Sequence, residues 1–178
     1  MMLKAEAITS YTFTSTDELL LDTNVWLLVY GPQKPGDRRV AVYSGALARI
    51  LAARSRIYID VLIVSEFINT YARLQWKLSF SSFADFKQFR KSTHFQPIAQ
   101  DIAADMKRVL QHCTRIANGF ESLAIDAVLD IYMAGDSDFN DQILAAICQR
   151  AGLKLITDDA DFKGWDIPVI TANRRLLA

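Results

Sequence analysis

Four short apolar runs, each followed or preceded by a longer stretch of helical periodicity, constrain the fold of this 178-residue chain most strongly. This alternation is typical of strand–helix units, in which parallel strands form a sheet flanked by helices. The predicted strands are residues 18–22, 56–60, 153–156 and 167–171, with a weaker candidate near 94–98. We therefore expect an α/β domain of three layers, α/β/α, with a central parallel sheet of four or five strands.

The periodic stretches between these runs predict helices at about 38–53, 61–78, 82–91, 99–115, 121–133 and 138–151. Residues 31–37 and 92–97 are rich in Pro, Gly and polar residues and are predicted loops. Because no repeat, low-complexity tract or linker interrupts the sequence, we expect a single domain over residues 1–178.

Composition excludes several classes of protein. The 20 Lys and Arg residues balance 20 Asp and Glu residues, so a uniformly basic coat for nucleic acid is absent. No two glycines have the GxG spacing of a dinucleotide site, and two histidines and two distant cysteines do not predict a zinc site. Without an apolar run of membrane length or a secretory leader, we expect a cytoplasmic protein that binds no membrane.

Acidic residues follow the ends of predicted strands or lie in the first turns of the helices. These residues are Asp22, Glu66, Asp138, Asp141, Asp158, Asp159 and Asp161. Each one alone is explained as a helix N-cap or as an acid favoured by the helix dipole. Taken together they are less easily explained, because parallel strands end at one edge of the sheet, where open α/β sheets bind ligands.

Carboxylates gathered at one edge repel each other strongly. Two unit charges at 4 Å cost about 4 kcal/mol at an effective dielectric of 20, so a cluster favours protonation or a bound cation. Oxygen ligands without His or Cys select Mg²⁺ or Mn²⁺. The pattern therefore predicts metal-assisted hydrolysis at phosphorus, in which a metal-activated water is the nucleophile.

The order of these motifs resembles the PIN-domain nucleases, most closely the toxin ribonucleases of the VapC type. The resemblance extends from about residue 19 to residue 171 and includes "LLLDTNVWL", "SEFIN", "NDQILAAICQRAGLKLITDDADF" and "IPVIT". It implies an acidic quartet of catalytic metal ligands, which are Asp22, Glu66, Asp141 and Asp159. Asp138 and Asp161 are secondary ligand candidates, and Asn24 and Thr157 are expected to hold carboxylates by hydrogen bonds.

This resemblance implies a Mg²⁺- or Mn²⁺-dependent endoribonuclease that leaves a 5′ phosphate and a 3′ hydroxyl, and a toxin with an antitoxin partner. The chain departs from such toxins in an N-terminal extension over residues 1–17 and a predicted insertion at 77–97. The alternatives are a catalytically silent PIN-like binding or assembly module and a stand-alone RNA-processing nuclease. A metal-free mechanism that uses His94 and His112 is the least favoured.

Two further segments each have two interpretations. Between residues 34 and 56 lie six basic residues and one acid, of which Arg38 and Arg39 are the best candidates to bind the RNA backbone. The alternative is an ordinary solvated helix face. Residues 71–95 carry seven aromatic side chains, and Phe80, Phe83, Phe86 and Phe89 recur every three residues. They predict either core packing or an interface, for a homodimer or for the helix of an inhibitory partner.

Overall fold

The computed structural model describes residues 5–135 and 137–178. Its strands form one parallel sheet in the order β1-β6-β5-β2-β3-β4. The strands are β1 (Glu6–Ala7), β2 (Glu18–Leu21), β3 (Arg56–Ile59), β4 (Cys113–Arg115), β5 (Lys154–Ile156) and β6 (Val169–Thr171). The sheet therefore has six strands, and the prediction of four or five was wrong.

The two edge strands account for this difference. The expected strand at 94–98 is wrong because those residues belong to the start of α5 (Phe95–Gln111), and β4 lies after that helix. The predicted helix at 99–115 included β4, since "CTR" is short and largely exposed and carries no apolar run. β1 is only two residues long and lies in the N-terminal extension. An edge strand has one neighbour, so it needs no buried pattern that a sequence would reveal.

Eight α-helices lie within the described residues. Besides α5 they are α1 (Thr23–Tyr30), α2 (Arg38–Ala52), α3 (Val61–Ser79), α4 (Phe86–Lys91), α6 (Ile125–Ala134), α7 (Phe139–Ala151) and α8 (Arg174–Leu177). Four of them begin where an aspartate side chain accepts a backbone N–H of the first turn: Asp37, Asp60, Asp85 and Asp138. None of the helices in residues 5–135 and 137–178 has the length and apolar character that a membrane crossing requires.

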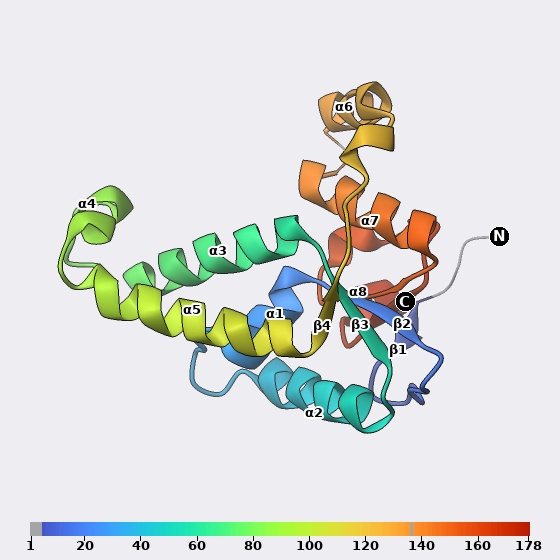
Figure 1. The fold of residues 1–178 in the computed structure, drawn as a ribbon, viewed down its shortest axis with the longest axis horizontal. Helices are drawn as coiled ribbons and strands as arrows, with labels where there is room; N and C mark the ends of the chain where they lie inside the picture. Colours follow the sequence, from blue (N-terminus) through green and yellow to red (C-terminus); the bar gives the residue numbers. More distant parts are fainter. Residues whose placement is uncertain (1–4, 136) are drawn as a thin grey trace.

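The central strand β2 lies between β5 and β3, and its residues Leu19, Leu20 and Leu21 are buried. Right-handed crossovers put helices on both faces of a parallel sheet, and α2 and α7 lie on opposite sides of it in Figure 1. α3 and α5 run side by side away from the sheet with α4 at their far end, and α6 lies beyond α7 (Figure 1). The carboxyl end of β2 therefore lies at the centre of the sheet edge, between the ends of β5 and β3.

The aromatic side chains around α4 pack mainly on one another. Phe89 is fully buried, and its ring centroid lies 4.8 Å from that of Phe80 and 5.5 Å from that of Phe95. Phe83 and Phe86 lie against Phe89 as well. The helix here is shorter than the predicted 82–91, so these rings gather from a turn and a helix rather than from one helical face. Core packing is the interpretation that the structure supports for Phe89.

The N-terminal extension is part of the sheet and the core. β1 pairs with β6, and Ile8 is fully buried. Asp17 is buried beside Lys154, whose Nζ lies 2.7 Å from its carboxylate, and it also accepts the Tyr11 hydroxyl and the Thr14 amide. Burial alone would raise the pKa of Asp17, but these hydrogen bonds hold it below its ordinary value.

We expect Asp17→Asn to lower the free energy of unfolding by about 2 kcal/mol at neutral pH, because it leaves Lys154 without its charged partner. The corresponding fall in Tm is about 4–8 °C. The stabilisation is present above the unfolded pKa of an aspartate and is lost as the pH falls through the lower folded pKa. Thermal unfolding of Asp17→Asn and of a control on the exposed side of α5, Asp101→Asn, measures this fall. Equal Tm values for the two variants would contradict the prediction.

Candidate active site

Asp22 and Thr157 are brought together by the pairing of two strands that are far apart in the sequence. Leu21 of β2 is in register with Ile156 of β5, and the Asp22 N–H donates to the Ile156 carbonyl over 2.9 Å. The next residue on each strand therefore lies at the same carboxyl edge. There the Thr157 hydroxyl donates to Asp22 Oδ2 over 2.7 Å, with both side chains buried.

Asn24 completes a hydrogen-bond network around Asp22. Its Nδ2 donates to Asp22 Oδ2 and to Thr157 Oγ1, and its Oδ1 accepts the backbone N–H of Asp158 over 3.1 Å. The backbone N–H of Asp159 donates to Thr157 Oγ1 over 3.0 Å. The network holds one oxygen of Asp22 and fixes the backbone that carries Asp159.

Three other parts of the chain supply acids to the same place: α3, the start of α7 and the segment after β5. Glu66 on α3 accepts a hydrogen bond from the Thr23 hydroxyl over 3.3 Å, and Asp141 lies in the first turn of α7. Together with the acids that follow β2 and β5, these side chains line a pocket of 310 Å³. Its lining consists of Asp22, Asn24, Glu66, Asp138, Asn140, Asp141, Asp159 and Asp161. All four residues of the implied quartet and both secondary candidates thus line one pocket, which we call the acidic pocket.

Helix capping explains only part of this arrangement. Asp138 Oδ1 accepts the Asn140 N–H over 2.8 Å, and Asp159 Oδ1 accepts the Asp161 N–H over 3.0 Å. One oxygen of each therefore stabilises a helix start. Asp22 occupies the N-cap position of α1, yet its side chain makes no capping hydrogen bond. A nearly inaccessible carboxylate that does not cap its helix is expensive to bury without another role.

The acidic pocket disfavours the charged form of its carboxylates. Burial raises the pKa of Asp22 to about 6, with repulsion from Glu66 and Asp159 acting in the same direction and the Thr157 hydrogen bond against it. Burial also raises the pKa of Asp141 to about 7, with repulsion chiefly from Asp22 and Asp159. The pKa of Glu66 is raised by burial and by Asp138 and Asp159. A cation in this pocket would relieve the repulsion.

The donors in the pocket suit a hard cation. Among the described residues, the lining comprises six carboxylates and two side-chain amides, with no His or Cys. Oxygen donors of this kind fit Mg²⁺ or Mn²⁺. No three His, Cys, Asp or Glu side chains within 5–135 and 137–178 form a group that encloses one ion. The two observations are compatible, because Mg²⁺ keeps several waters, and carboxylates too far apart to enclose one ion directly can hold it through those waters.

Several candidate residues lie outside the acidic pocket. Asp158 turns away from it and accepts hydrogen bonds from Tyr43 and Arg39 over 2.9 and 3.0 Å. Arg39 also pairs with Asp37 over 2.6 Å, so two carboxylates neutralise it, whereas Arg38 is exposed at the start of α2.

The two histidines lie at opposite ends of α5. His94 is at its N-cap and His112 at its C-cap, with 17 helical residues between them. At a rise of 1.5 Å per residue this separates them by about 25 Å. They cannot act on one phosphate.

Two polar residues of this site were not among the predicted ones. Asn140 lines the pocket, and Thr23 donates to Glu66. Asn140 lies between Asp138 and Asp141 in the sequence, so its position next to two candidate residues could have suggested it. The link from Thr23 to Glu66 joins α1 to α3, and no local spacing reveals such a contact.

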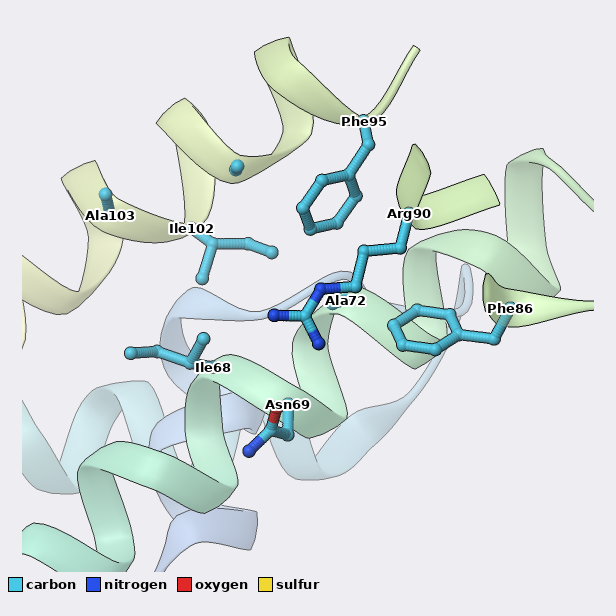
Figure 2. Close-up of a pocket in the computed structure, with 9 residues that line it drawn as sticks. Ile68, Asn69, Ala72, Phe86, Arg90, Phe95, Ile102 and Ala103 are labelled. Carbon is cyan, nitrogen blue, oxygen red and sulfur yellow. The ribbon is translucent and has the colours of Figure 1, made fainter. Parts of the chain in front are cut away.

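A second pocket lies between α3, α4 and α5, away from the acidic pocket. It has a volume of 180 Å³ and its lining is Ile68, Asn69, Ala72, Phe86, Arg90, Phe95, Ala99, Ile102 and Ala103. Figure 2 shows the Arg90 side chain extending into this mainly apolar space toward Ala72. Among the described residues, Arg90 has no ion pair. We call this surface the Arg90 groove.

A carboxylate-lined pocket at the switch point of a parallel sheet defines an α/β protein with a candidate site for a hard cation and a phosphate-bearing ligand. A model of the PIN domain matches residues 19–168, and the chain belongs to the PIN-domain family. PIN domains are generally nucleases and typically use divalent metals. No curated protein matches the chain. The closer resemblance to VapC-type toxins stays a prediction.

We expect Asp141→Asn to stabilise the protein in EDTA at about pH 8, because it removes one buried charge from a repelling cluster. The gain is on the order of 1 kcal/mol, or about 2–4 °C in Tm, since solvent in the open pocket screens the repulsion. A carboxyl whose folded pKa is raised to about 7 loses stability as the pH rises from its unfolded pKa toward 7. The difference between variant and wild type should therefore shrink toward about pH 4.

Differential scanning fluorimetry at several pH values measures this difference. Asp101→Asn, on the exposed side of α5, is the matched control, and its Tm should follow that of the wild type. A variant at residue 141 that is less stable than wild type at about pH 8 would refute the repulsion.

Proposed function

We propose that this protein is a Mg²⁺- or Mn²⁺-dependent endoribonuclease. The observation that carries the proposal is the gathering of six carboxylates, from four separate parts of the chain, in one pocket at the carboxyl edge of the sheet. Membership of the PIN-domain family supports nuclease chemistry. RNA as the substrate, and the cleavage that leaves a 5′ phosphate and a 3′ hydroxyl, belong to the proposal.

In this proposal Asp22, Glu66, Asp141 and Asp159 hold the metal, and Asp138 and Asp161 are secondary ligands. A metal held by these carboxylates would supply an activated water and would stabilise the leaving oxygen. Asn24 and Thr157 orient Asp22 through their hydrogen bonds to Oδ2. Thr23 orients Glu66 in the same way. Such supporting contacts are worth roughly 10- to 100-fold in metal affinity or activity.

Arg38 is proposed to hold the phosphate backbone of RNA, because it is exposed at the start of α2. Arg39 has a smaller part in this contact, since Asp37 and Asp158 already balance its charge.

The purified protein should cut a mixed RNA pool in Mn²⁺ or Mg²⁺ and lose this activity in EDTA. Asp22→Asn should lower kcat/KM by roughly 100-fold or more, because the substitution removes a metal-binding charge. Asp101→Asn, on the exposed side of α5, is the control and should match wild type. The 5′ ends of the products should be ligatable without added kinase, as 5′ phosphates are. Equal cutting in EDTA or by Asp22→Asn contradicts the metal mechanism.

The alternative of a catalytically silent binding module makes a different prediction in the same assay. It binds RNA in gel-shift experiments and cuts none of it in Mn²⁺. The presence of all four acids in one pocket favours turnover, because a binding module gains nothing from carboxylates that repel phosphate.

We also propose that the protein acts as the toxin of a toxin–antitoxin pair, with the stand-alone RNA-processing nuclease as the alternative. The Arg90 groove supports a protein partner. Its volume and apolar walls suit one apolar side chain from a partner helix, and Arg90 suits one carboxylate on that helix (Figure 2). An antitoxin segment with these two properties is the partner that this groove fits.

Induced expression in a bacterial host should stop growth for the wild type and not for Asp22→Asn. Co-expression of a small protein encoded next to this gene should restore growth. Arg90→Glu in the toxin should abolish that rescue while the toxin remains active, because the new glutamate would repel the carboxylate on the partner helix. Growth that continues with active wild-type enzyme argues for the RNA-processing alternative.

A homodimer is proposed on the exposed apolar side chains of α6 and the turn before it. These side chains are Phe120, Leu129, Ile131, Tyr132 and Met133. An apolar surface of this kind on a projecting helix is typical of an interface. Light scattering of the purified protein measures the mass, and a monomer at high concentration would exclude the dimer.

A further inference from the structure

A third pocket, of 290 Å³, adjoins the acidic pocket and shares one residue with it. Asn24 lines both. Its Nδ2 faces Asp22 and its Oδ1 accepts the N–H of Asp158, which turns into the third pocket. We call this space the Lys34 pocket, and its lining is Asn24, Leu27, Leu28, Pro32, Gln33, Lys34, Asp37, Arg39, Leu74 and Asp158.

The walls of the Lys34 pocket differ from those of the acidic pocket. Leu27 and Leu28 of α1, Leu74 of α3 and Pro32 supply apolar surface. Such surface favours a flat, poorly hydrated group such as a nucleobase. Of the polar lining residues, Gln33, Lys34 and Asp37 belong to the loop between α1 and α2, whereas Asn24 lies in α1, Arg39 in α2 and Asp158 after β5.

This loop is held at both ends. The Gln33 side-chain amide donates to the carbonyls of Leu27 and Gly31 and so satisfies the C-terminal end of α1. At the other end Asp37 caps α2 and pairs with Arg39, which reaches Asp158 after β5. Lys34 lies between these two anchors, so its backbone is placed before any ligand arrives.

The charges in the Lys34 pocket leave one group available for an anion. Arg39 lies within 3.0 Å of the carboxylates of both Asp37 and Asp158. Lys34 is exposed, and within 5–135 and 137–178 it has no ion pair. A phosphate at the rim would therefore meet Lys34 rather than Arg39.

We propose that the Lys34 pocket binds the nucleotide next to the scissile phosphate, with its base against Leu27 and Leu74 and its phosphate on Lys34. This inference rests on the proposed function, because it assumes that RNA is cut at the acidic pocket. The side-chain amides of Asn24 and Gln33 and the guanidinium of Arg39 already have partners, so few polar groups remain to read base edges. The pocket therefore holds the chain in place more than it selects a base.

The test uses the full-length protein and a labelled RNA oligonucleotide that contains one mapped cleavage site. Lys34→Ala should raise KM roughly fivefold and change kcat by less than twofold, because a phosphate contact made equally in substrate and transition state affects binding alone. Lys107→Ala, an exposed lysine of α5 that lines neither pocket, is the matched control.

Two further measurements separate a phosphate contact from a structural effect. In an Asp22→Asn background, in which cutting should be too slow to consume the RNA during a binding measurement, Lys34→Ala should reduce the slope of log affinity against log salt concentration by about 0.7, the value for one phosphate of a single strand. An RNA with one abasic nucleotide beside the cleavage site should bind wild type more weakly, and Leu74→Glu should remove that difference.

The outcomes distinguish the two levels of the proposal. If wild type cuts RNA but Lys34→Ala matches Lys107→Ala in KM and in salt dependence, the Lys34 pocket is not a nucleotide subsite and the nuclease proposal stands. If wild type neither cuts nor binds RNA, both proposals fail. A raised KM together with an unchanged salt slope also overturns the subsite, because it separates the effect from a phosphate.

Discussion

The parallel pairing of β2 with β5 is the contact on which the candidate site depends. It aligns Leu21 with Ile156 and so brings Asp22 to the Thr157 hydroxyl. A slip of one residue in this register would turn Asp22 to the other face of the sheet, away from Thr157 and the other acids. The apolar residues of both strands resist that slip because Leu19, Leu20, Leu155 and Ile156 are all fully or almost fully buried. The same strand pairing therefore packs the core and sets the geometry of the site.

The acidic pocket opposes the stability of the fold that forms it. Burial and mutual repulsion raise the pKa values of Asp22 and Asp141 to about 6 and about 7, so at neutral pH the fold holds charges that it disfavours. The sheet and the hydrogen bonds from Asn24 and Thr157 keep Asp22 in place despite this. Strain of this kind at one place in an otherwise well-packed protein is what a binding site for a cation requires.

Much of the fold could be predicted from sequence where burial leaves a pattern. β2, β3, β5 and β6 were predicted because strands covered on both faces are continuous apolar runs. β1 and β4 were missed because edge strands need no such run. Residues 94–98 were misassigned because Phe95 and Ile98 suggested a short strand, whereas they belong to the start of α5. The acids of the pocket were predicted from the rule that parallel strands end at one edge, whereas Thr23 and Asn140 depend on how α1, α3 and α7 face each other.

The sequence by itself determined which residue types stand at the ends of the strands, and hence that carboxylates gather at one edge. The tertiary structure decided which of them share a pocket: Asp159 lines it, while Asp158 turns to Tyr43 and Arg39. Adjacent residues after a strand point in different directions, and the neighbouring helices determine what each one meets. The contact between Arg39 and Asp158 also depends on the tertiary structure. Arg39 is on α2, and it can reach Asp158 only because the fold places α2 beside the end of β5. Contacts between distant segments carry no local signal, so only the folded chain reveals them.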